Sequence, residues 1–182
     1  MGKATGLTGR LAVDVDRAFP ELVLSYQDRL YPGVRSFVGA ADAEDVTQEA
    51  FIRAHKALHS YQEDRIEALQ LSAWLWTIAL NLCRNWARTR SRRPQTVQLA
   101  FDHSGGDQAE DEAVDAVMLD EWKGRLAGLS DVQRVAVVLR HVVGLSYQEI
   151  ATATERPVGT AKTDVSRGLA ALRNIISEEG SP

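Results

Sequence analysis

Amide and arginine side chains recur along the segment from about residue 72 to residue 93. Spacings of three or four place four of them on one face of a helix: Asn81, Arg84, Asn85 and Arg88. Trp74, Trp76 and Trp86 lie between and beside them. This composition is expected where unpaired bases stack on aromatic rings and their edges accept hydrogen bonds, so melted or single-stranded DNA is a candidate ligand. Periodicity leaves one alternative open, in which the tryptophans are core residues beneath a solubilising arginine face.

A second set of polar side chains lies at the start of a helix expected over about 158–176. Its members are small hydrogen-bonding or basic residues: Thr160, Lys162, Thr163, Ser166 and Arg167. Ahead of it, Ser146 and Glu149 have the spacing of a capping box, which predicts a short helix before a tight turn. A short helix, a turn and a longer helix with a basic outer face, here about 146–167, is a helix-turn-helix, whose second helix enters the major groove. The alternative is a solvated face on an ordinary core helix.

Catalytic and metal-binding patterns are weak in this sequence. His55 and His59 are four residues apart, but Lys56 replaces the glutamate of a zincin motif and no third ligand is evident. We therefore interpret them as a surface pair and expect no metal site, with a helical metal hydrolase kept as a rival hypothesis. Cys83 lies in an apolar stretch and is interpreted as a small core residue. We predict no catalytic residue, no cofactor and no enzymatic activity.

Composition limits the class of protein. The chain has 182 residues, of which 45% are hydrophobic, and one cysteine, so it forms no internal disulfide and no cysteine-based zinc module. This cysteine usage suits a reducing compartment, so we expect a cytoplasmic protein. The longest stretch without a charge, residues 68–83, is too short and too polar to span a bilayer, so no membrane insertion is expected.

Charge and composition divide the chain. The formal net charge is −4, yet eight acids and no Lys or Arg lie between Phe101 and Glu121, and the remainder holds 21 basic against 17 acidic residues. The segment 95–115 is hydrophilic and contains two adjacent glycines, which predicts a flexible acidic linker. The expected organisation is an N-terminal tail at 1–15, a domain at 16–94, the linker at 95–115 and a second domain at 116–178.

Both domains have helical periodicity without strand-like alternation, which predicts an all-α fold of two small helical domains. In the first, an apolar stripe spans 19–38, and Pro32 is expected to bend or interrupt this helix. A second helix starts at Asp42 as N-cap and continues to about Leu58, and a third begins near Ser72 and ends before Pro94. In the second, helices are expected at about 130–143, 146–152 and 158–176, the first with a Ser130–Gln133 capping box and closed by Gly144. The predicted buried stripe of the last helix is Ala161, Val165, Leu169, Leu172 and Ile176.

Several of these segments together resemble one family. DAEDVTQEAFIRA (42–54) resembles the core-polymerase-binding helix of the extracytoplasmic-function (ECF) sigma factors of bacterial RNA polymerase, and AWLWTIALN (73–81) resembles the start of their −10 recognition helix. LSDVQR (129–134), GLSYQEIA (144–151) and GTAKTDVSRG (159–168) resemble their −35-reading helix-turn-helix. The resemblance implies a sigma region 2 bundle and a sigma region 4 module on either side of the linker.

The resemblance also implies roles for individual residues. The polymerase would be contacted by Asp45, Gln48, Glu49 and Phe51. The −10 element would meet Asn81, Arg84, Asn85 and Arg88, with a flipped base held by the loop at about 60–71. The −35 major groove would be read by Lys162, Thr163, Ser166 and Arg167, beside Thr160.

The function that the resemblance implies is that of a specificity factor. Such a protein binds core RNA polymerase, recognises the −10 and −35 elements of promoter DNA, helps to melt the promoter, and has an anti-sigma factor as a further partner. The alternative is a free-standing helix-turn-helix transcriptional regulator. Asp164 and Leu169 stand where the family commonly has arginine, and an acid near DNA predicts weaker −35 binding.

Overall fold

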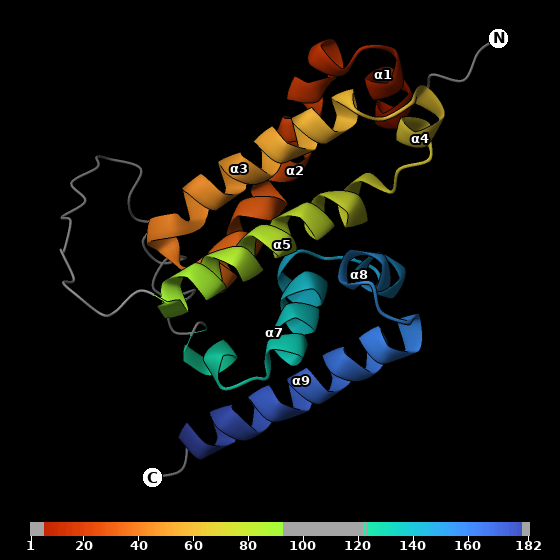
Figure 1. The fold of residues 1–182 in the computed structure, drawn as a ribbon. Coiled ribbons are helices and arrows are strands. Elements are labelled where there is room, and N and C mark those ends of the chain that lie inside the picture. Colours follow the sequence, from red (N-terminus) through yellow and green to blue (C-terminus); the bar gives the residue numbers. More distant parts are fainter. Residues whose placement is uncertain (1–5, 93–121, 123, 180–182) are drawn as a thin grey trace.

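The structure is a computed structural model that describes residues 6–92, 122 and 124–179, and within these ranges it is helical with no strand (Figure 1). The N-terminal region contains α1 (Leu7–Val13), α2 (Val15–Val38), α3 (Ala40–His59), α4 (Glu63–Glu67) and α5 (Leu71–Arg92). The C-terminal region contains α7 (Asp131–Val137), the π-helical turn η1 (Val138–Val142), α8 (Tyr147–Thr154) and α9 (Val158–Glu179). The predicted linker at 95–115 lies outside the described residues. None of the described helices is long and apolar enough to cross a membrane.

The predicted N-terminal tail is wrong for residues 7–13. They form α1, which packs against α2 and α4 and buries Leu11 completely. Arg10 pairs with Glu21 of α2 on the outer side of this contact. The segment is too short for periodicity to identify it, because its helix depends on packing rather than on propensity.

Two helix boundaries in the N-terminal region differ from the prediction. Helix α3 begins at Ala40, after Gly39 with a φ of 88°, so Asp42 lies inside its first turn instead of acting as N-cap. There Asp42 accepts a bond of 3.3 Å from Arg90 of α5, a residue 48 positions away that no local rule would pair with it. Pro32 lies inside α2, which continues without a break from Val15 to Val38.

The caps predicted for the C-terminal region are confirmed. Ser130 with Gln133, and Ser146 with Glu149, form complete capping boxes, and Gly144 has a φ of 82°. The predicted stripe of α9 is correct for Ala161, Val165 and Leu172 and wrong for two residues. Leu169 is 36% exposed and Ile176 is 40% exposed.

The helix predicted over 130–143 changes its winding after Val137. In η1 the amide of Val143 donates to the carbonyl of Val138 at 3.1 Å, five residues back. This wider turn places Val138 and Val143 on the same side, and both are buried.

The two regions share one apolar core. Helix α8 lies beside α5 (Figure 1), and η1 packs on α2. At Gly33 of α2 the approach is close: a Cβ there would lie 2.4 Å from Cη2 of Trp76 and 2.8 Å from Cγ2 of Val143. Any larger side chain at position 33 would therefore collide with Trp76 of α5 and with Val143, which directly follows η1.

A polar contact accompanies this apolar seam. Burial raises the pKa of the Glu149 carboxyl, but hydrogen bonds from Ser146 and from Ser72 of α5, with the nearby charge of Arg29, outweigh burial and lower the pKa below its usual value. Glu149 is thus ionised at neutral pH, where it caps α8 and also joins it to the N-terminal region.

We expect the Gly33→Ala variant to be less stable than wild type by about 1–3 kcal/mol, because the added methyl overfills the crossing. Alanine normally stabilises a helix interior relative to glycine, so a loss of unfolding free energy in this variant would itself indicate the close contact. The matched control is Gly159→Ala, where nothing lies within 4 Å of the added Cβ and stability should not fall. Urea unfolding of the three proteins measures the differences, and equal behaviour of the two variants would contradict the packing at Gly33.

Candidate nucleic-acid interface

Helix α5 presents the amide and arginine side chains on its outer face. Asn81, Arg84, Asn85 and Arg88 are all exposed and form what we call the α5 ridge. Leu75, Ala79 and Leu82 are buried on the opposite side and fix the orientation of the helix. Arg84 Nη1 donates to Asn81 Oδ1 at 3.0 Å, which holds the guanidinium along the helix surface. The ridge therefore offers donors and acceptors suited to base edges and phosphates.

The three tryptophans of α5 have different environments. Trp76 is 2% exposed and belongs to the core. For this residue the alternative interpretation, that the tryptophans are core residues, is correct. Trp74 and Trp86 are half-buried. The Arg90 guanidinium lies over the Trp86 ring at 5.1 Å, which makes that edge of α5 cationic and aromatic together.

An aromatic and cationic cluster precedes α5 in the segment 60–71, where α4 was not anticipated. Tyr61 Oη accepts from Trp74 Nε1 at 3.5 Å, and the two rings meet edge to face at 6.2 Å. The Arg65 guanidinium lies 3.6 Å from the centre of the Tyr61 ring. Sequence reasoning missed Tyr61 and Arg65 as site residues, because they join the cluster through tertiary contacts rather than helical spacing.

The helix-turn-helix is formed by α8 and α9. Glu155 closes α8 in the left-handed conformation, with a φ of 56°, and Pro157 accepts from the amide of Ala161 at the start of α9. On the outside of α9, Lys162, Thr163, Ser166 and Arg167 are exposed and Thr160 is half-buried; these five residues are called the α9 tip. Lys162 Nζ lies 5.7 Å from the centre of the Tyr147 ring, which Arg140 approaches at 4.8 Å.

Asp164 of α9, one of the two departures from the family pattern, forms an ion pair within the protein. Asp164 Oδ2 lies 3.0 Å from Arg156 Nη1, and its side chain is only 15% exposed. The carboxylate thus faces the turn between α8 and α9 rather than the outer face of α9. Leu169, the other departure, lines an apolar groove with Trp122 and Val142.

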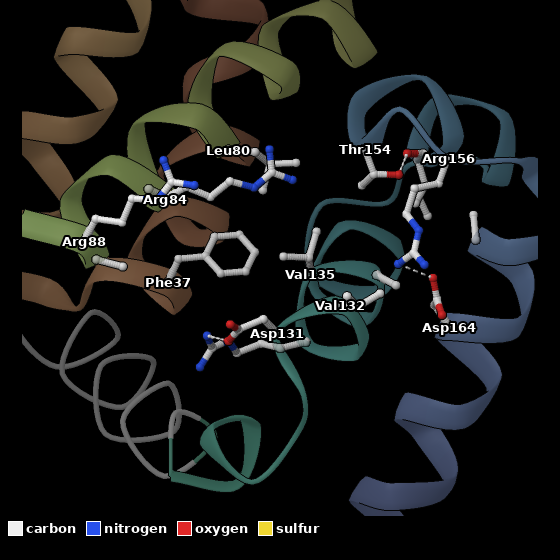
Figure 2. Close-up of a pocket in the computed structure, with 16 residues that line it drawn as sticks. Phe37, Leu80, Arg84, Arg88, Asp131, Val132, Val135, Thr154, Arg156 and Asp164 are labelled. Atoms are coloured by element: carbon white, nitrogen blue, oxygen red, sulfur yellow. Dashed lines mark hydrogen bonds and ion pairs between the residues drawn. The ribbon is translucent and has the colours of Figure 1, made fainter. Parts of the chain in front are cut away.

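A cleft of about 400 Å³ lies between the end of α5 and the C-terminal region (Figure 2). Arg84 and Arg88 border it on one side, and Asp131, Val132 and Asp164 border it on the other. Phe37 lies between α5 and α7 in this view. Cys83 also lines the cleft, and burial raises the pKa of its thiol to about 12, so it is a protonated core residue.

The outer face of α3 is acidic and polar. Asp45 and Gln48 are exposed, and Glu49 pairs with Arg53 at 2.7 Å. Phe51, for which the resemblance implies a polymerase contact, is 9% exposed and packs in the core. Its neighbour Ile52, which sequence reasoning missed, is 47% exposed and is the large apolar side chain of this face.

The structure adds a third group to the histidine pair. Asp16 of α2 meets His55 and His59 at the other end of α3, although no third ligand was evident from the sequence. Hydrogen bonds from His55 and then His59 lower the pKa of the Asp16 carboxyl. Within the described part of the chain, these three residues form the group whose potential ligand atoms all lie within 4.8 Å of one another.

Comparison with known proteins identifies both regions. Residues 22–93 match Sigma-70 region 2, and residues 119–172 match Sigma-70, region 4. The ECF RNA polymerase sigma-E factor of Escherichia coli K12 is 33% identical over 180 residues, covering 93% of this chain and 92% of that protein. The RNA polymerase sigma-H factor of Pseudomonas aeruginosa is 35% identical over 167 residues, covering 86% and 84%.

Solved structures give the same result. The structure of CnrH in complex with the cytosolic domain of CnrY has a TM-score of 0.74 at 26% identity and covers 96% of this chain and 97% of that one. The sigma factor RpoE from Bartonella quintana, solved with the anti-sigma factor NepR, has a TM-score of 0.64 at 25% identity, with coverage of 87% and 96%. With two region matches in order and full-length relatives above 30% identity, the chain belongs to the ECF sigma factors of RNA polymerase.

Proposed function

We propose that this sigma factor binds core RNA polymerase through the outer face of α3 and binds promoter DNA through α5 and α9. The observation that carries the proposal is the α5 ridge, whose four amide and arginine side chains are exposed together on one helix face. As a sigma factor the protein directs transcription initiation, and it does so in the cytoplasm while the polymerase carries out the chemistry. Asp45, Gln48, Glu49 and Ile52 are the proposed polymerase contacts.

The α5 ridge binds the −10 element as it opens. Asparagine amides hydrogen-bond adenine edges and arginine hydrogen-bonds guanine or phosphate, which suits strands whose bases have left the stack. Tyr61 and Trp74 lie at the start of α5 and offer aromatic surface to an unstacked base. The binding energy of these bases offsets the cost of melting.

The α9 tip reads the −35 element in the major groove. Lys162 and Arg167 neutralise phosphates or pair with guanine, and Thr160, Thr163 and Ser166 hydrogen-bond base edges or backbone. Because Asp164 pairs with Arg156 inside the module, it does not repel the DNA as the sequence alone suggested.

The two regions must separate to bind both elements. The −35 and −10 elements are centred about 25 base pairs apart, or about 85 Å at 3.4 Å per base pair. A compact chain of this length has a radius of gyration of about 16 Å. The packed arrangement of α5 on α8 is therefore the conformation of the unbound protein, and polymerase holds the regions apart.

An anti-sigma factor is a further partner in this proposal. RpoE was solved with the anti-sigma factor NepR, and the fold of that sigma factor covers most of this chain. The partner of this protein would bind where it keeps α5 and α9 from DNA.

The first test is run-off transcription with core polymerase on a promoter mapped with the wild-type protein. The double variant Asn81→Ala, Asn85→Ala should lose about tenfold or more of the open-complex signal, because base contacts of about 1–3 kcal/mol each are removed. A template with a pre-melted −10 region should recover part of the loss if the ridge acts in melting. The matched control is Arg17→Ala, an exposed arginine of α2, and an equal loss in the control would contradict the proposal.

The second test concerns the α9 tip. Lys162→Ala and Arg167→Ala should each reduce the slope of log affinity against log salt by about 1 for holoenzyme on duplex −35 DNA. Asp164→Asn should leave this affinity within about twofold and lower the stability of the module by about 1 kcal/mol, since it loses the Arg156 pair. A large gain in DNA affinity for Asp164→Asn would show instead that the acid faces the DNA.

The third test follows the separation of the regions. Fluorophores on Thr89→Cys of α5 and Thr152→Cys of α8 report the distance between two exposed positions, while the buried Cys83 thiol stays unlabelled. Energy transfer should be high in the free protein and fall when core polymerase and promoter are added. Unchanged transfer in the complex would contradict the separation, and tight promoter binding without polymerase would favour a free-standing regulator.

A further inference from the structure

Three side chains whose atoms can bind a metal ion converge where the start of α2 meets the end of α3. Asp16 Oδ1 lies 2.9 Å from His55 Nε2 and 3.0 Å from His59 Nε2. The two Nε2 atoms are 3.3 Å apart. One carboxylate oxygen and two imidazole nitrogens therefore form a small triangle.

The three distances between these ligand atoms match the distances expected between atoms that bind one metal ion. Two ligand atoms about 2.0–2.1 Å from a zinc ion are about 3.3 Å apart at the tetrahedral angle and about 2.9 Å apart at a right angle. All three observed distances fall in or next to this range. Both Nε2 atoms also meet one and the same oxygen, of a residue 39 and 43 positions away in the chain.

The helices and neighbouring rings hold the three groups in place. His55 and His59 are one turn apart on α3, so both imidazoles leave the same face. The two rings meet edge to face with centroids 4.6 Å apart, and Phe19 of α2 packs edge to face on His55 at 4.8 Å. Because α2 and α3 pack along their length, the arrangement is formed before any ion binds.

We propose that Asp16, His55 and His59 bind one divalent transition-metal ion of the zinc, cobalt or nickel class. Two imidazoles and one carboxylate suit these ions, whereas calcium and magnesium prefer oxygen ligands alone. The Asp16 side chain is 73% exposed, and those of His55 and His59 are 36% and 46% exposed, so the ion can reach the site and water completes its coordination. The proposal concerns metal binding and the stability of this helix pair, and it does not rest on the proposed function.

The bound ion would join the first turn of α2 to the last turns of α3. No other described contact of the three side chains would have to change, because their ligand atoms already face one another. The effect is a cross-link between two helices that are adjacent in the chain but whose joined ends lie 39 or more residues apart. Metal should therefore stabilise the N-terminal region against unfolding.

Titration of the untagged, chelator-treated full chain with zinc chloride or cobalt chloride tests the proposal. Calorimetry should show one ion per chain, and cobalt should give visible absorption bands. Asp16→Asn, His55→Gln and His59→Gln should each weaken binding by at least about tenfold. The matched control is His141→Gln, a histidine in η1 outside the cluster, which should bind as wild type does.

Thermal unfolding separates metal binding from a purely structural role. Zinc at about 100 times its dissociation constant should raise the Tm of wild type and of the His141 variant by about 5 °C, and should not raise it in the three ligand variants. Because the three side chains are largely exposed, the metal-free variants should unfold within a few degrees of wild type. The proposal is overturned if the wild type binds no ion, if binding survives in all three ligand variants, or if the variants lose stability equally with and without zinc.

Discussion

The close crossing of α2, α5 and η1 at Gly33 is the constraint on which the rest of the structure depends. Only hydrogen at this position lets the Trp76 ring and the Val143 side chain pack against the α2 backbone at the distances observed. Trp76 fixes the inner face of α5, and Val143 brings the C-terminal region onto the same core. A chain that the sequence divides into two small domains thereby folds around a single apolar interior, which lessens the instability expected of each small domain alone.

Helix α5 combines a packed inner face with a polar outer face, and the outer face is the one proposed to bind DNA. Its inner residues are committed to the shared core, so its rotation about its own axis is determined, and the amide and arginine side chains have to point outward. In α9, too, the buried residues determine which side chains face outward, and Asp164 is the exception. Asp164 is turned toward Arg156 and away from the outer face, so the exposed charge on this part of α9 comes from Lys162 and Arg167.

Local chemistry was predictable from the sequence, and contacts between distant residues were not. The capping boxes at Ser130 and Ser146 and the glycine at 144 depend on residues within a few positions, and the structure confirms all three. The α5 ridge follows from helical spacing alone. In contrast, the start of α3 at Ala40, the burial of Phe51 and the arrival of Asp16 beside the histidine pair depend on how α2, α3 and α5 pack. Helix α1 is the same case, since its helicity comes from Leu11 entering a core built by later residues.

If the regions separate on binding as proposed, the apolar contact between them lowers the apparent affinity of the protein for its partner. A macromolecule that needs the regions apart encounters only the open fraction of the chains, and its apparent dissociation constant equals the intrinsic value divided by that fraction. If one chain in a hundred is open, the apparent affinity falls about 100-fold, equivalent to about 2.7 kcal/mol. Under the proposed opening, the packing of the Trp76 ring and the Val143 side chain against Gly33 thus adjusts how much core polymerase is needed to recruit the protein.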